Sequence, residues 1–150
     1  MALQVFRFAF AALGLAAILI GVMMFLMGPA ATGHVFASML DAVAATGTDL
    51  PGLSEANTDS ELRFYSVFWL VYGLVVLRVS GRLPEALPQA RMLLALFSIG
   101  GIGRVLSVAT AGIPHPLFLV LMWVELVLPA VLLGVSFLGG AAAGREENGI

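Results

Sequence analysis

Two residues of opposite charge interrupt long apolar stretches of this 150-residue chain. Arg104 lies in the stretch 91–111, seven residues before its end. Glu125 lies in the next stretch, 117–138, eight residues after its start. If both stretches are membrane-spanning helices, a rise of about 1.5 Å per residue places the charges about 10 Å and about 12 Å from the same surface. Because a lone charge inside a membrane is costly, we predict that Arg104 and Glu125 form an ion pair that can hold a polar ligand head.

Small residues surround Arg104 on its own stretch. Gly100 lies four residues before it and Ser107 three residues after it, on the same face of a helix. Gly101 and Gly103 remove two further side chains next to the arginine. Glycines of this kind either let two helices approach closely or leave room for a ligand, and both uses stay open here.

Polar and aromatic residues also share one face of the stretch 62–80 and of the residues just before it. Glu61, Tyr65, Phe68 and Tyr72 repeat at helical spacing. This face begins at the membrane surface and descends toward the depth of the ion pair. With its polar neighbours it predicts a ligand-binding funnel that opens outward. The candidate ligand-binding residues are Asp59, Glu61, Tyr65, Tyr72, Arg104, Ser107, His115 and Glu125.

The same residues have structural interpretations that involve no ligand. Thr58 and Glu61 have the spacing of a capping box, in which both side chains bond backbone amides of the first helical turn. The pair of Arg104 and Glu125 could serve only to set the register of two helices. His115 is most simply an interfacial residue, since a metal site needs several ligands and the sequence offers no such set.

The composition is that of a membrane protein. Hydrophobic residues make up 61% of the chain and charged residues 11%, with a mean hydropathy of +1.05. Soluble domains average about 45–50% apolar and about 25% charged residues. Such apolar composition excludes a disordered chain, and a net charge of -2 without a basic stripe argues against a nucleic-acid partner. With no cysteine, the chain has no disulfide framework, Fe–S cluster or thiol nucleophile.

Four stretches are long enough to cross about 30 Å of hydrocarbon. They lie at about 5–27, 62–80, 91–111 and 117–138. The first exceeds the apolar run of about 7–15 residues in a signal peptide, so we interpret it as a retained span. The chain is therefore predicted to be all-α, an integral membrane four-helix bundle that forms a single domain over residues 1–150.

The distribution of arginine predicts the orientation in the membrane. The connection 28–60 has four acidic residues and no Lys or Arg, whereas arginines occur near both termini and around the connection 81–90. The positive-inside rule then places both termini in the cytoplasm and the long loop 28–60 in the periplasm of a bacterial inner membrane. Within that loop, residues 34–45 have apolar residues at helical spacing and predict a short amphipathic helix.

Three motifs resemble a known family. They are residues 57–66, residues 100–107, and Pro114-His115-Pro116 followed by Glu125-Leu126. Together they resemble the DUF4345 family of small four-span bacterial membrane proteins of unknown function, over about residues 5–138. The chain is also similar, more weakly, to the DoxX-like four-span proteins. The resemblance implies the four-helix architecture but supplies no substrate and no catalytic residue.

Three functions are compatible with these residues. The preferred one is binding of a small amphipathic molecule, such as a quinone, a lipid or a sterol-like compound. The alternative is an accessory subunit of a larger membrane complex or a homo-oligomer, with Ala11, Gly14 and Gly21 as a docking surface. An intramembrane enzyme is the weakest reading, because the sequence has no recognisable nucleophile, metal set or cofactor motif.

Overall fold

The computed structural model describes residues 2–147, and all its regular elements are helices. Four of the helices are long and apolar enough to cross a membrane, the last of them over Pro116–Leu138. The predicted all-helical architecture with four spans is therefore confirmed. The helices are α1 (Ala2–Met27), α2 (Pro29–Ala44), α3 (Ala56–Ser80), α4 (Leu87–Ala111) and α5 (Pro116–Glu147).

The helix α3 begins six residues earlier than the predicted span, and this removes the expected capping box. Its N-cap residue is Glu55, whose carbonyl accepts a hydrogen bond of 2.8 Å from the backbone N–H of Asp59. No side chain caps this end of the helix. Thr58 and Glu61 therefore lie within the helix, and their interpretation as a capping box is wrong.

The predicted amphipathic helix is present as α2. It starts immediately after Gly28, whose φ of 86° lies in the region that favours glycine. Thr32 and Ala37 are buried and Phe36 and Leu40 are half-buried, so one face of α2 packs against the bundle.

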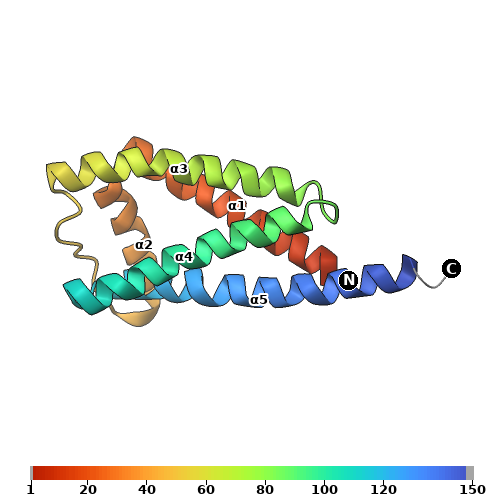
Figure 1. The fold of residues 1–150 in the computed structure, drawn as a ribbon. Coiled ribbons are helices and arrows are strands. Elements are labelled where there is room, and N and C mark those ends of the chain that lie inside the picture. The colour runs from red at the N-terminus through yellow and green to blue at the C-terminus, as the bar shows by residue number, and fades with distance from the viewer. Residues whose placement is uncertain (1, 148–150) are drawn as a thin grey trace.

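Two helix pairs make up the bundle. α1 packs along α3, and α4 packs along α5, while α1 and α5 join the two pairs. α3 and α4 touch only over a short stretch and diverge from the turn that connects them (Figure 1). We call the end with this turn, residues 81–86, the turn end of the bundle. The opposite end, with α2 and residues 45–55, is the loop end (Figure 1).

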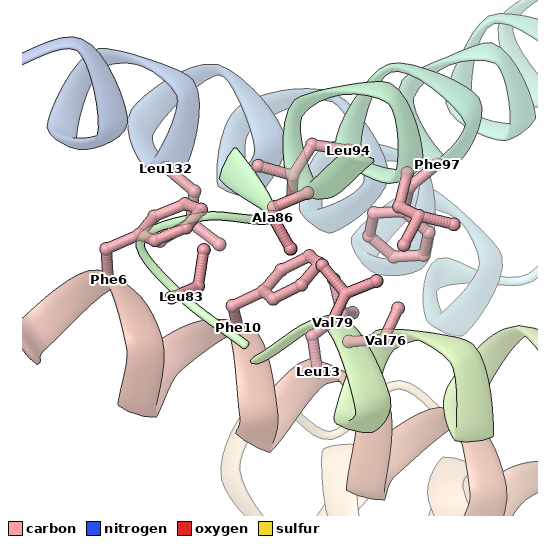
Figure 2. Packing of buried hydrophobic residues seen from close by; sticks show 12 residues of the cluster. Phe6, Phe10, Leu13, Val76, Val79, Leu83, Ala86, Leu94, Phe97 and Leu132 are labelled. Carbon is pink, nitrogen blue, oxygen red and sulfur yellow. The ribbon is translucent and has the colours of Figure 1, made fainter. Parts of the chain in front are cut away.

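The main hydrophobic core lies at the turn end. Phe6 and Phe10 of α1 stack with their ring centroids 5.5 Å apart, and both are fully buried. Leu83 and Ala86 bring the connecting turn itself into this core (Figure 2). The other members of the buried cluster are Leu13, Val76, Val79, Ala90, Leu93, Leu94, Phe97 and Leu132. This packing holds α3 and α4 together at one end only.

Glycines bring α1 and α3 into close contact. A Cβ added to Gly73 would lie 2.6 Å from the backbone oxygen of Gly14, and one added to Gly21 would lie 2.9 Å from Cγ of Leu70. The expectation that Gly14 and Gly21 form a surface for a partner protein is therefore wrong. They are used inside the chain, and they keep α3 against α1 rather than against α4.

Candidate functional site

Arg104 of α4 and Glu125 of α5 form the predicted ion pair. Nε of Arg104 donates to Oε2 of Glu125 over 2.8 Å. The carboxylate side chain is only 6% exposed, and the guanidinium side chain is 33% exposed. Gly101 makes the pair possible, because a Cβ at this position would lie 2.9 Å from the Leu126 side chain and 3.1 Å from Cβ of Glu125.

The ion pair leaves several polar atoms without a partner among the described residues. The two Nη groups of Arg104 make no hydrogen bond there, and neither does Oε1 of Glu125. The guanidinium lies 6.0 Å from the ring centroid of Phe118, which is within the range of a cation–π contact. Donors and one acceptor therefore remain available at the same place.

A groove between α3 and α4 leads to this pair. It has a volume of about 550 Å³. We call it the α3–α4 groove, and it is lined by Tyr65, Phe68, Trp69, Tyr72, Leu96, Phe97, Gly100, Gly103, Arg104, Ser107 and Glu125. Most of this lining is aromatic or apolar. Phe68 and Leu96 are 58% and 52% exposed within membrane-spanning helices, so the open side of the groove faces lipid.

The groove differs in shape from the expected funnel. The sequence pattern predicted a polar funnel that opens at the membrane surface. Neither α2 nor the loop at residues 45–55 contributes to the lining, and the opening runs along the gap between α3 and α4. The reason is the divergence of these two helices toward the loop end (Figure 1).

Three aromatic rings close the groove on the side of the turn end. The hydroxyl of Tyr72 donates to the backbone oxygen of Leu93 over 3.0 Å and so ties α3 to α4. Its ring stacks on Phe97 with a centroid distance of 6.2 Å, and Trp69 contacts both rings edge-on. Tyr72 is therefore part of the wall of the groove.

The glycines of α4 have two separate uses. Gly101 is buried and allows α4 to pack on α5. Gly103 faces open space, since an added Cβ would meet no atom within 4 Å. A Cβ at Gly100 would meet only Oε2 of Glu125, at 3.6 Å. Gly101 thus serves close packing of two helices, whereas Gly100 and Gly103 leave space beside Arg104.

Arg104 also borders a smaller cavity near the connection between α4 and α5. This cavity has a volume of about 200 Å³. Its lining consists of Arg104, Ser107, Val108, Pro114 and Phe118. The guanidinium and the Ser107 hydroxyl therefore lie where the α3–α4 groove meets a second space.

Asp59 and Glu61 are not brought to the groove. Asp59 binds Arg63 over 2.7 Å, and Arg63 also donates to the backbone oxygen of Phe25 over 2.8 Å. These contacts fasten the first turns of α3 to the end of α1. Glu61 is exposed and does not line the groove. The prediction that Asp59 and Glu61 belong to the site is wrong, because α3 diverges from α4 toward the loop end.

His115 lies at the loop end and does not line the groove. Its Nε2 is 3.2 Å from the backbone oxygen of Gly47, and its Nδ1 accepts from the backbone N–H of Leu117 over 3.2 Å. The imidazole thus joins the loop after α2 to the start of α5. In this structure it serves as a link between two chain segments.

Leu96 and Phe97 of α4 also line the groove but were not among the residues predicted from the sequence. Phe97 precedes Arg104 by two helical turns and Gly100 by three residues, so its spacing places it on the same face. That spacing was a usable signal. It was hidden because nearly every residue in this stretch is apolar.

Comparison with known proteins gives a family and no activity. The model of the family described as a domain of unknown function, DUF4345, matches residues 5–136. No curated protein matches the chain at a significant level. The same is true of the solved structures.

Proposed function

Because this multi-pass membrane chain belongs to the DUF4345 family, a domain of unknown function, we propose its function from the site itself. The protein binds a small amphipathic molecule in the α3–α4 groove. The molecule enters sideways from the bilayer, with its apolar body between the two helices and its polar head at Arg104 and Glu125. The same proposal places the protein in a bacterial inner membrane with both termini in the cytoplasm.

The observation that carries the proposal is the position of the ion pair in the groove. Aromatic walls lead to unused donors on Arg104 and an unused acceptor on Glu125. An apolar cavity with a few convergent polar groups is typical of small-molecule sites, whose volumes are about 300–1,000 Å³. A pair that served only to set helix register would need neither the groove nor the open glycines beside it.

A variant that fills the groove tests this proposal. Gly103 lines the groove, and a Cβ there would meet no atom within 4 Å, so Gly103→Leu should fill part of the groove. Gly134→Leu is the matched control, because Gly134 of α5 also faces open space and does not line the groove. The measurement is native mass spectrometry of each protein after mild extraction from its own membrane.

We expect the wild type and Gly134→Leu to retain a small molecule that Gly103→Leu has lost. Equal retention by all three proteins contradicts the proposal, because the molecule then binds elsewhere. A protein partner carried equally by all three, with no small molecule, also contradicts it. That second result supports the alternative role of an accessory subunit.

A further inference from the structure

We infer that the α3–α4 groove selects amphiphiles whose polar head is uncharged and carries both a carbonyl and a hydroxyl group, and that it discriminates against anionic heads. This inference rests on the proposed function and names the chemical class of its ligand. It follows from the charge and the hydrogen-bonding capacity of the groove.

The charge of the lining is the first argument. Among the residues that line the groove, Arg104 is the basic one and Glu125 the acidic one, and their charges neutralise each other at 2.8 Å. An anionic head would add a net negative charge at a depth where charges are costly. It would also lie close to a carboxylate that is 6% exposed and poorly solvated. An uncharged head leaves the site neutral.

The second argument is the balance of donors and acceptors. A guanidinium can only donate hydrogen bonds, and an ionised carboxylate can only accept them. Arg104 has Nη donors to offer, and Glu125 has Oε1 as an acceptor. A carbonyl oxygen of the ligand can accept a hydrogen bond from the Arg104 Nη groups, and a hydroxyl group of the ligand can donate one to Oε1 of Glu125. A head made only of anionic oxygens satisfies Arg104 and leaves Glu125 facing a like charge.

Access to both groups is the third argument. Gly100 lies on the groove beside the carboxylate, and a Cβ there would be 3.6 Å from Oε2 of Glu125. Gly103 leaves open space one residue before Arg104. The absence of these two side chains opens a path from the aromatic part of the groove to the ion pair.

Trp69 provides a direct readout of occupancy. The chain has two tryptophans, and Trp123, which is 60% exposed and outside the groove lining, is removed by Trp123→Phe. Two probes share one dibrominated stearyl chain, whose bromines quench a tryptophan on contact. One probe ends in a glycerol ester, which is uncharged, and the other ends in a sulfonate, which is always anionic. Both are titrated into phosphatidylcholine nanodiscs that hold the protein.

We expect the glycerol ester to quench Trp69 saturably, at a midpoint about tenfold lower than that of the sulfonate. Glu125→Gln should reverse this preference, because the amide oxygen can still accept from Nε while the site gains a net positive charge. Glu85→Gln is the control for overall charge. It removes an exposed acid in the turn at residues 81–86 and should leave the preference unchanged.

The possible results separate the inference from the proposed function. Tighter binding of the sulfonate by the wild type, or an unchanged preference in Glu125→Gln, overturns the inference about the head group. Saturable quenching that Gly103→Leu abolishes would still support the groove as a binding site. If neither probe quenches saturably, and Gly103→Leu changes nothing, the proposed function itself fails.

Discussion

At the Arg104–Glu125 pair, one hydrogen bond of 2.8 Å joins two charges from different membrane-spanning helices. Each charge is tolerated because the other is present. The carboxylate is the more dependent partner, since its side chain is 6% exposed against 33% for the arginine. Removal of the arginine leaves a buried charge without compensation, whereas removal of both leaves an apolar contact.

Arg104→Leu should therefore lower the free energy of unfolding by about 3 kcal/mol, because it leaves the buried Glu125 carboxylate without a partner. The double variant Arg104→Leu/Glu125→Leu should recover most of that loss. Denaturation in detergent, followed by circular dichroism, measures both. If the double variant is as unstable as the single one, packing and not charge explains the effect.

At the scale of helices, glycine decides which pair packs tightly. Gly73 and Gly14 put the backbones of α1 and α3 in direct contact, so neither can accept a side chain without a shift of the helix. Gly103 of α4 has no such neighbour and faces the groove. Glycine therefore allows close packing between α1 and α3, and at Gly103 it leaves space in the groove beside α4.

Alanine substitutions distinguish these two uses. Gly73→Ala should destabilise the protein by about 1–3 kcal/mol, because its Cβ would lie 2.6 Å from a backbone oxygen that cannot rotate away. Gly103→Ala should be neutral or stabilising by up to about 1 kcal/mol, since alanine is the better helix former. Unfolding in a graded series of sodium dodecyl sulfate is the measurement. Equal effects at both positions would show that helix propensity dominates.

At the scale of the molecule, the arrangement of helix pairs creates the site. α3 packs along α1, and α4 packs along α5. The hydrophobic core joins the two pairs at the turn end. Arg63 fastens the start of α3 to the end of α1 with a hydrogen bond of 2.8 Å to Phe25. α3 and α4 meet at the turn end and diverge toward the loop end (Figure 1). The α3–α4 groove lies between them.

The orientation of the whole molecule can be tested because the chain has no cysteine. Asp49→Cys places a thiol in the exposed loop after α2, and Glu85→Cys places one in the exposed turn between α3 and α4. With acidic residues outside and arginines inside, a membrane-impermeant maleimide should label Asp49→Cys in spheroplasts and Glu85→Cys only after lysis. The reverse pattern would refute the predicted topology.

The sequence by itself determined the number of candidate spans and the position of each polar residue along its helix. Both follow from composition and from the constant rise of a helix, which are properties of single segments. The same reasoning paired Arg104 with Glu125 across a short connection, where antiparallel packing leaves little choice. It also identified Tyr65, Tyr72 and Ser107, which line the groove.

Only the tertiary structure decided the lateral position of these residues. The position of a residue along its helix does not determine which other helix it packs against. That choice depends on how the surfaces of the two helices fit together. Gly14 and Gly73 bring α3 against α1, and Asp59 and Glu61 at its start do not line the groove at Arg104. His115 contacts the loop at Gly47 and also lies outside the groove lining. Packing between segments that are distant in the sequence therefore decided which residues line the groove. The local sequence pattern could predict only where each residue lies along its own helix.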